Sequence, residues 1–212
     1  MPKTALLLGA TGLVGSQLLD QLLADDRYEK VVALSRRPFD REHPKLKTEI
    51  INFDRPDPEK IRGDELYCAL GTTLRKAGSK EAQYRIDCTY PYEFGKIARA
   101  NGVRQYLLVS SIGADANSGN FYLRTKGELE QKLAALEFPA FISARPSFLL
   151  GQRSEFRLAE RVGIQLAQIF AFLIPKKYRG IPAAQVAKTL IALANEQRQG
   201  VHLLDSDRLW EF

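Results

Sequence analysis

The sequence predicts an α/β protein in which a doubly wound parallel sheet lies between two layers of helices, with a small C-terminal cap. Strand-like and helix-like stretches alternate along almost the whole chain, and three closely spaced glycines follow the first strand-like stretch. The 212 residues are 45% hydrophobic and 26% charged, which is ordinary for one globular domain with its own core. We therefore expect a single domain over residues 1–212, with residues 147–182 as the cap.

The expected elements follow from the spacing of apolar residues and from the turn residues between them. Strands are expected over residues 4–8, 31–34, 49–53, 66–70, 105–109, 141–144 and 201–204. Helices are expected over residues 13–24, 87–100, 122–136 and 183–196, and within 156–174. The helix within 156–174 is apolar on a broad face, which suits packing on the sheet, a contact in a homodimer or a roof over an apolar substrate.

The residues that carry metal and hydrolase chemistry are scarce. Cys68 and Cys88 are far apart, and the two histidines, His43 and His202, lie near neither of them in sequence. No spacing typical of a zinc or iron site is present. A hydrolase is also disfavoured, because its nucleophile needs a histidine base that a third group holds in place.

Charge and hydropathy limit the partners. The formal net charge is +6, but basic residues are spread along the chain and mixed with acidic ones. This scatter is typical of a solvated surface, so no specific nucleic-acid partner is expected. No stretch is suited to a signal peptide or long and apolar enough for a membrane span, which favours a cytoplasmic protein.

The glycine-rich turn lies between the first expected strand and the first expected helix. In such a turn one glycine adopts a conformation that other residues disfavour, one lets the backbone approach a pyrophosphate, and one lets the helix pack on the strand. The N–H groups and the dipole at the helix start favour the diphosphate. No Gly-Lys-Ser/Thr follows, which excludes a Walker loop. The sequence therefore predicts a dinucleotide site formed by Gly9, Thr11, Gly12, Leu13, Val14 and Gly15.

The residues after the second strand select among the dinucleotides. An acidic residue there would bind the ribose hydroxyls of NAD and repel an added phosphate. This chain instead has Ser35, Arg36 and Arg37. Guanidinium groups match the 2′-phosphate of NADP in a planar, charge-assisted way. NADP(H) is therefore the predicted cofactor; the alternative is that both arginines are merely exposed surface residues.

Three further segments complete a pattern seen in known enzymes. Residues 110–115 read Ser-Ser-Ile-Gly-Ala-Asp, 122–128 read Tyr-Leu-Arg-Thr-Lys-Gly-Glu, and 68–73 read Cys-Ala-Leu-Gly-Thr-Thr. Together with the glycine turn and Arg145–Pro146, they resemble the short-chain dehydrogenase/reductase superfamily. The likeness is closest to its small atypical members, which include the Tat-interacting protein family and many bacterial proteins. It spans nearly the whole chain and implies a Rossmann fold.

The resemblance assigns roles to a serine, a tyrosine and a lysine. Tyr122 and Lys126 are four residues apart, so they share one face of a helix. An ammonium close to a phenol favours the phenolate and so suits acid–base catalysis. The resemblance implies that Tyr122 donates or accepts the proton, that Lys126 also holds the nicotinamide ribose, and that Ser111 steadies the substrate oxygen. Ser110 is the other candidate for the serine.

Lesser cofactor contacts are expected where later strands end. Asp54, after the third strand, resembles the residue that touches adenine; the alternative is a solvated loop aspartate. Leu70 and Gly71 should line the cofactor after the fourth strand, where a glycine permits close approach of the backbone. Pro146, after the sixth strand, is expected near the nicotinamide amide.

The Tyr-x-x-x-Lys spacing occurs twice, because Tyr92 and Lys96 also match it. Tyr92 belongs to the helix before the fifth strand and is expected to pack beside the sheet. Tyr122 follows the strand that carries the serines. We therefore assign catalysis to Tyr122.

Two functions remain open from the sequence. The first is an oxidoreductase that uses NADP(H) on a small carbonyl or alcohol substrate. The second is a non-catalytic regulatory or scaffold protein that responds to NADP(H). The second is motivated by the small substrate region and by the short connection between Ser111 and Tyr122, whose Gly113 and Gly119 predict flexibility.

Overall fold

The computed structural model describes residues 2–151, 175–196 and 198–212, and it confirms the predicted α/β fold. Within these residues, seven strands form one parallel sheet in the order β3-β2-β1-β4-β5-β6-β9. The strands are β1 (Lys3–Leu8), β2 (Tyr28–Ser35), β3 (Leu46–Ile50), β4 (Glu65–Cys68), β5 (Gln105–Val109), β6 (Ala140–Arg145) and β9 (Gly200–Asp205). The chain starts in the middle and winds outward in both directions, so the order reverses between β1 and β4.

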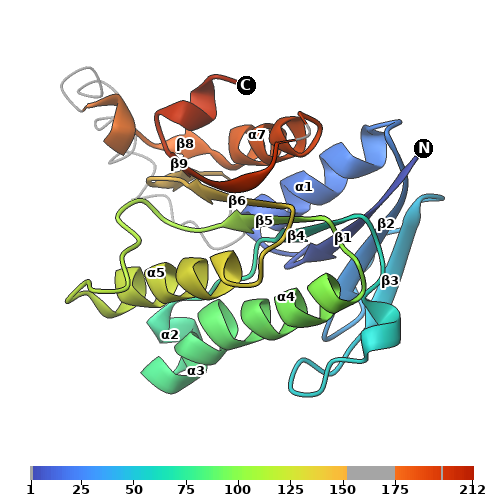
Figure 1. Ribbon diagram of the computed structural model, residues 1–212, viewed down its shortest axis with the longest axis horizontal. Helices are drawn as coiled ribbons and strands as arrows, with labels where there is room; N and C mark the ends of the chain where they lie inside the picture. The colour runs from blue at the N-terminus through green and yellow to red at the C-terminus, as the bar shows by residue number, and fades with distance from the viewer. Residues whose placement is uncertain (1, 152–174, 197) are drawn as a thin grey trace.

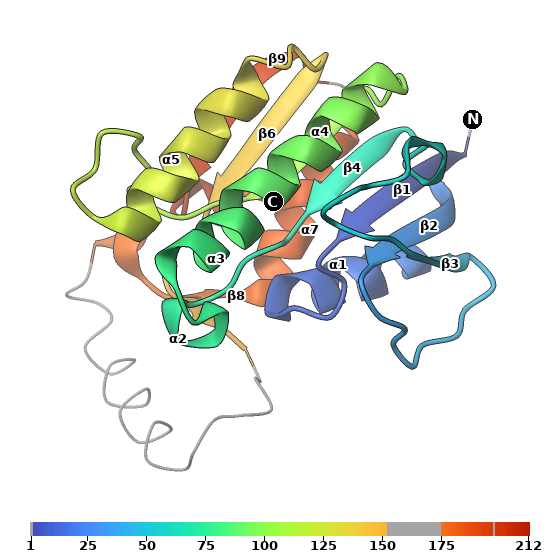
Figure 2. The same cartoon turned by 90° about the horizontal axis from the view of Figure 1, so that it is seen from below.

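Helices cover both faces of the sheet (Figures 1 and 2). On one face α1 (Leu13–Ala24) packs beside α7 (Ala183–Ala194), and on the other lie α4 (Tyr90–Ala100) and α5 (Phe121–Ala134). Successive residues of the central strands point to opposite faces and so separate into two cores. Both faces of these strands are buried, which explains why they read as continuous apolar runs instead of alternating ones.

The third strand differs from its prediction. It runs over Leu46–Ile50 instead of residues 49–53. Ile51 and Phe53 are buried after the strand has ended, and the Phe53 ring packs edge-on against Tyr90 and Phe94 of α4. The prediction was wrong at this end because a buried loop can carry the same apolar side chains as a strand.

The helix before β5 begins earlier than predicted. Two short helices, α2 (Leu74–Ala77) and α3 (Lys80–Tyr84), precede a π-helical turn over Arg85–Thr89 that leads directly into α4. Thr73 and Ser79 accept N–H hydrogen bonds at the starts of α2 and α3. The residues between Thr73 and Ser79 include a glycine and several charged residues, which hide the apolar spacing of a helix. The sequence therefore did not predict α2 and α3.

The two ends of the expected cap meet in a separate two-stranded sheet. Strands β7 (Leu149–Leu150) and β8 (Ile181–Pro182), which were not predicted, pair in parallel, and Ser147 Oγ donates a hydrogen bond to the Arg179 carbonyl. The predicted apolar helix within 156–174 lies outside the described residues. In the part of the chain that is described, no helix has the length and apolarity that crossing a membrane requires.

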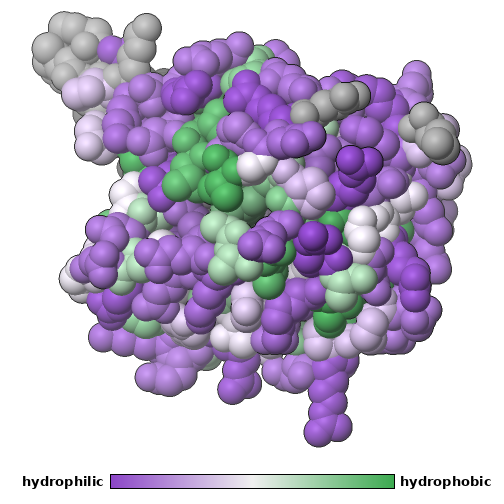
Figure 3. Space-filling view, in the orientation of Figure 1, coloured by the Kyte–Doolittle hydropathy of each residue, from purple (hydrophilic) through white to green (hydrophobic). Residues whose placement is uncertain are grey.

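The edge strand β9 leaves part of one sheet face uncovered. Val201 and Leu203 are exposed, and they pair with Phe141 and Ser143 of β6, which are buried. Figure 3 shows apolar surface in this part of the molecule. The other end of the sheet, at β3, carries charged side chains such as Lys47 and Glu49, which form an ion pair.

Candidate functional site

The glycine turn has the geometry that the sequence predicted. Gly9 has φ +85°, and a Cβ there would lie 2.7 Å from the Ala69 carbonyl oxygen. A Cβ at Gly15 would collide with the Gly9 carbonyl oxygen, so only glycine allows α1 to approach β1 this closely. Gly9 therefore serves the turn and Gly15 the packing.

The start of α1 is open to an anion. Gly12 is the N-cap residue and supplies no side chain, and no side chain of the described residues caps this helix. The first N–H groups of the helix are consequently left for a ligand. Thr11 is exposed and Leu13 is half-buried, whereas the Val14 side chain lies in the core, so Val14 can reach a ligand only through its backbone.

The arginine pair lies where β2 ends. Arg36 and Arg37 are exposed, and among the described residues no carboxylate pairs with either. The Arg36 guanidinium lies 5.7 Å from the centroid of the Phe53 ring. Ser35 Oγ donates to the Arg37 carbonyl at 2.7 Å, which fixes the turn after the strand. Both cations are thus free to meet a phosphate at the same sheet edge as the glycine turn.

Asp54 lies beside this corner but is not simply solvated. Its Oδ1 accepts a hydrogen bond of 2.8 Å from the Tyr90 hydroxyl and lies 3.9 Å from Arg85 Nη1. The side chain is still largely exposed. The tyrosine therefore holds the carboxylate in one orientation and leaves an edge of it free.

Tyr122 and Lys126 share a face of α5, as predicted. Tyr122 is 36% exposed, whereas Lys126 is only 3% exposed, and the Lys126 Nζ lies 6.0 Å from the centroid of the Tyr122 ring. None of the hydrogen bonds between described residues uses this Nζ. Burial alone would lower the pKa of Lys126, but the charges that Tyr122, Asp87 and two thiols can carry outweigh it and raise the pKa. Lys126 is therefore a buried residue whose ammonium keeps its N–H groups for solvent or for a ligand.

The two serines after β5 differ in exposure and bonding. Ser111 is partly exposed, and its Oγ donates only to the neighbouring Ile112 carbonyl, at 3.3 Å. Ser110 is buried, and its Oγ has no partner among the described residues. The Pro146 carbonyl accepts the Ile112 N–H at 3.0 Å and ties the end of β6 to this turn. Ser111 is therefore the more accessible of the two serines.

The connection between Ser111 and Tyr122, for which the sequence predicted flexibility, packs on α5. The Asp115 N–H donates to the Leu123 carbonyl, and Gly127 lies so close to the Asp115–Ala116 backbone that a Cβ would collide with it. The Asn120 side chain accepts the Leu123 N–H at the start of the helix. These contacts fix where α5 begins and therefore where Tyr122 lies.

The turn after β4 faces Lys126. Leu70 is half-buried and packs against the core on the α4 side. A Cβ at Gly71 would lie 3.8 Å from Asp87 Oδ1 and 3.9 Å from Lys126 Nζ, which is ordinary contact. Unlike Gly9 and Gly15, Gly71 is not required by the free protein, so its lack of a side chain leaves room for a ligand.

Asp87 is a site residue that the sequence did not reveal. It is fully buried, and its Oδ1 accepts the Thr72 N–H at 2.7 Å. Burial raises the pKa of Asp87, while Lys126, Thr72 and Gln83 act in the opposite direction. The predicted helix started at this residue, so it looked like a helix-start aspartate; the π-helical turn instead directs it inward.

The second Tyr-x-x-x-Lys pair has the packing role that was predicted for it. Tyr92 is partly buried against the core on the α4 side, and the Lys96 Nζ lies 5.2 Å from its ring centroid. Lys96 also pairs with Glu93 on the same helix. This pair is away from the glycine turn.

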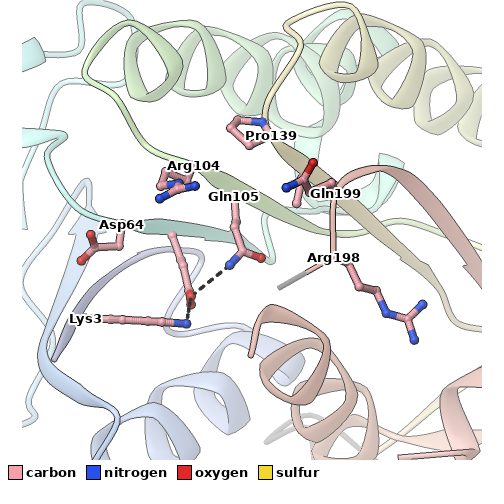
Figure 4. A pocket seen from close by; sticks show the side chains of 9 residues that line it. Lys3, Asp64, Arg104, Gln105, Pro139, Arg198 and Gln199 are labelled. Carbon is pink, nitrogen blue, oxygen red and sulfur yellow. Dashed lines mark hydrogen bonds and ion pairs between the residues drawn. The ribbon is translucent and has the colours of Figure 1, made fainter. Parts of the chain in front are cut away.

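A cavity of about 390 Å³ lies at the opposite, amino-terminal edge of the sheet (Figure 4). Its buried carboxylate, Glu65, accepts hydrogen bonds from Lys3 at 2.6 Å and from the hydroxyls of Tyr28 and Tyr67. None of the predicted site residues lines this cavity. Among the described residues, no group of acidic, histidine and cysteine side chains could hold a metal ion.

Comparison with known proteins also indicates a dinucleotide-binding protein. A family model described as NAD(P)H-binding matches residues 9–197. The mitochondrial protein FMP52 of Debaryomyces hansenii is 36% identical over 203 residues, covering 91% of this chain and 88% of its own length. HTATIP2 of Rattus norvegicus is 34% identical over 199 residues, covering 91% of this chain and 80% of its own. The solved structure of MoeE5 in complex with UDP-glucose and NAD superposes with a TM-score of 0.74 at 16% identity, covering 95% of this chain and 75% of that one, which supports the fold alone.

The expectation of a cytoplasmic protein is contradicted by these relatives. The FMP52 proteins of Debaryomyces hansenii, Candida glabrata and Aspergillus niger are all named as mitochondrial. The expectation relied on the lack of an apolar signal or membrane segment. That criterion does not distinguish the cytoplasm from an organelle whose import signals are amphipathic.

The family match spans most of the chain, and the relatives from Debaryomyces hansenii and Rattus norvegicus each align over 91% of it. The structure independently has the turn, the open helix start and the sheet reversal that a dinucleotide requires. This chain is a member of the NAD(P)H-binding family with a Rossmann fold, and its relatives include FMP52 and HTATIP2.

Proposed function

We propose that this protein is an NADP(H)-dependent oxidoreductase of the short-chain dehydrogenase/reductase type that acts on a small carbonyl or alcohol, with Tyr122 as the proton carrier. The observation that carries the proposal is Lys126, a residue that is 3% exposed and whose ammonium has no hydrogen-bond partner among the described residues. It faces the open space at Gly71 and the Tyr122 ring. A ribose between Gly71 and Lys126 would give this buried charge its missing partners.

The chain's own groups suit the rest of the cofactor. The amides at the start of α1 would receive the diphosphate, and Arg36 and Arg37 would receive the 2′-phosphate. Asp54, held by Tyr90, would lie at the adenine end. Pro146 would lie at the nicotinamide end, where it already contacts the turn after Ser111 through its carbonyl. When bound, the reduced nicotinamide supplies a hydride to the substrate carbon.

The proton is handled by α5 and the turn after β5. The exposed Tyr122 hydroxyl would donate its proton to the substrate oxygen in reduction and accept it in oxidation. Ser111 Oγ would hold the same oxygen, since its present bond is a long one to a neighbouring carbonyl. The buried charge of Lys126 would stabilise the phenolate form that remains.

Calorimetry with NADPH and NADH tests the cofactor. We expect the wild type to bind NADPH more tightly and the double variant Arg36→Ala/Arg37→Ala to lose most of that preference. Each charge-assisted bond is worth about 1.5–3 kcal/mol before solvent screening, so the preference should fall by at least about tenfold. Arg62→Ala is the matched control, because Arg62 is an exposed arginine whose partner is Glu59. Equal loss of both cofactors in the double variant would contradict the assignment.

Turnover of a carbonyl panel with NADPH tests the proton carrier. Tyr122→Phe should reduce turnover by about 10²–10⁴-fold, the usual contribution of a positioned acid–base group. Tyr92→Phe carries the same change at the packing pair and should retain the wild-type rate. Equal rates for Tyr122→Phe and the wild type would remove Tyr122 from the chemistry.

A non-catalytic protein that responds to NADP(H) is the second candidate. The small substrate region that the sequence predicts after β6 is one reason for it. The flexibility predicted between Ser111 and Tyr122 supports it less, because this connection is packed on α5. NADPH binding without turnover of any carbonyl by the wild type, together with a cofactor-dependent partner in a pull-down, would favour this candidate.

A further inference from the structure

The cavity at the amino-terminal edge of the sheet is a second candidate site, apart from the glycine turn (Figure 4). Its volume of about 390 Å³ is that of a small-molecule pocket. Its wall is built where β1, β4, β5 and β6 begin, together with residues just before β9. Five segments that are distant in sequence therefore meet around one space that the proposed function does not use.

Most polar groups of this wall already have partners. Backbone N–H groups around the rim donate to carbonyl oxygens of neighbouring segments at 2.8–3.1 Å, as at Asp64, Arg104, Ala140 and Gly200. The buried Glu65 carboxylate accepts hydrogen bonds from an ammonium, two phenols and an amide. The few groups that lack partners therefore decide what the cavity can bind.

Two exposed side chains of opposite charge line the cavity without pairing. Asp64 immediately precedes β4 and Arg104 immediately precedes β5, and the Arg104 N–H donates to the Asp64 carbonyl oxygen at 3.0 Å. Their backbones are bonded, yet their side chains form no ion pair with each other or with another described residue. Asp64 Oδ2 accepts the Thr4 N–H at 2.7 Å, which orients the carboxylate. A separated cation and anion at one cavity are complementary to a ligand that carries both charges.

Gln105 adds an acceptor to the same wall. Its Nε2 donates to the Ala194 carbonyl at 2.8 Å and to Glu65 Oε1 at 3.3 Å, so the amide is held in one orientation. Its Oε1 is buried and has no partner among the residues that the structure describes. Figure 4 shows this oxygen on the side of the amide away from Glu65. Buried acceptors are rarely left without a donor, and a ligand's ammonium would supply one.

We propose that this cavity binds a free α-amino acid. Arg104 receives the carboxylate of the ligand, and Asp64 together with Gln105 Oε1 receives its ammonium. Pro139 and Ala140 form an uncharged part of the wall, which suits an apolar side chain. The proposal does not depend on the proposed oxidoreductase function, because the two sites lie at opposite edges of the sheet.

A simple anion fits the cavity less well. Inorganic phosphate would meet Arg104 but would bring its oxygens close to the Asp64 carboxylate. The other two cations of the wall, Lys3 and Arg198, already form ion pairs with Glu65 and Glu196. Arg104 is therefore the cation that is left for a ligand, and Asp64 opposes a purely negative one.

An NMR titration of the cofactor-free protein at pH 6.5 tests the proposal with three probes of similar shape. L-Valine carries both charges, isovalerate lacks the ammonium, and L-valinamide lacks the carboxylate. We expect valine to shift the Gln105 side-chain amide signals saturably. It should bind at least about tenfold more tightly than either analogue, the value of one charge-assisted bond after screening.

Two results of this titration would overturn the proposal. The first is the absence of saturable shifts at Gln105 up to about 50 mM valine, which covers the affinity open to a ligand of so few atoms. The second is equal binding of valine and isovalerate, which would indicate a simple anion site.

Two variants then assign the charges. Asp64→Asn keeps an oxygen for the Thr4 N–H, so it should abolish only the preference for valine over isovalerate. Arg104→Met should abolish only the preference for valine over valinamide. Both side chains are exposed, so neither change opens the core. Arg62→Met, at an exposed arginine paired with Glu59, is the matched control and should keep both preferences. A variant at Asp64 or Arg104 that keeps both preferences, or that weakens all three probes alike, would contradict the role assigned to it.

Discussion

Glu65 begins β4, and Lys126 faces the other end of the same strand; both are buried charges, but their surroundings are opposite. Glu65 is bonded to Lys3, Tyr28, Tyr67 and the amide of Gln105. Lys126 lies beside a glycine, with no hydrogen-bond partner among the described residues. The first arrangement satisfies its own charge, and the second leaves donors for something else.

The difference separates structure from function within one sheet. A buried polar group with a complete set of partners stabilises and orients the fold. A buried polar group that lacks them costs stability and is retained where a ligand completes it. The cavity of Figure 4 lies at the Glu65 end, where Gln105 Oε1 also lacks a partner among the described residues, whereas Lys126 lies at the other end of the strand. The comparison therefore sets a carboxylate with several partners against an ammonium that has no hydrogen-bond partner among the described residues.

The largest effect is expected at the amino-terminal edge. Glu65→Gln removes the charge that accepts hydrogen bonds from Lys3, Tyr28 and Tyr67, and each hydrogen bond to a charged group is worth about 1.5–3 kcal/mol. Denaturant unfolding should show this loss, whereas NADPH affinity of the folded variant should not change. Glu59→Gln, at an exposed carboxylate paired with Arg62, should leave the free energy of unfolding close to the wild-type value. A weakened NADPH affinity in folded Glu65→Gln would contradict the assignment of Glu65 to stability alone.

Alkaline pH should act on the same edge. Burial, together with the nearby Glu65 carboxylate, raises the pKa of the Tyr28 and Tyr67 phenols above the ordinary value of 10. The folded state then keeps protons that the unfolded chain loses, so stability is intact below pH 10 and falls as pH rises above it. Each phenol contributes a slope of about 1.4 kcal/mol per pH unit. Unfolding free energies measured from pH 9 to 11 should fall less steeply in Tyr28→Phe than in the wild type; equal slopes would contradict this.

Much of this arrangement could be predicted from the sequence because its signals are local. The apolar runs predicted the sheet, the expected helix over 13–24 coincides with α1, and the roles of Gly9 and Gly15 follow from their spacing. Tyr122 and Lys126 share a face because helix periodicity requires it. The NADP preference and the catalytic roles rest on the same local patterns and stay predictions.

The rest depends on contacts between distant segments. Asp87 reads as a helix-start residue, and only the π-helical turn directs it at Lys126. Phe53 was predicted to belong to a strand, because a buried residue in a loop is as apolar as one in a strand. The cytoplasmic expectation was wrong for another reason. It relied on the lack of an apolar signal segment, which does not distinguish the cytoplasm from an organelle.

Gly71→Ala sharpens the comparison with an intermediate effect. A Cβ at Gly71 would make only ordinary contacts in the free protein, so unfolding free energy should stay within about 0.5 kcal/mol. NADPH affinity should fall by about tenfold or more, because the methyl group occupies the space assigned to the ribose. Gly119→Ala, where a Cβ meets nothing within 4 Å, is the matched control and should change neither quantity. Wild-type affinity in Gly71→Ala would place the cofactor elsewhere.

The smallest effect is expected at Ser110, one of two buried serines near the ends of neighbouring strands. Ser143 Oγ donates to Glu130 at 2.7 Å, whereas Ser110 Oγ has no partner among the described residues. Ser143→Ala leaves a buried carboxylate short of a donor and should cost about 1.5–3 kcal/mol. Ser110→Ala removes only an unmet hydroxyl, so its unfolding free energy should match the wild type within about 0.5 kcal/mol or rise slightly. A loss at Ser110 as large as that at Ser143 would mean that its hydroxyl is already satisfied in the free protein, and the contrast between bonded and unmet groups would not hold on the strands that carry the site.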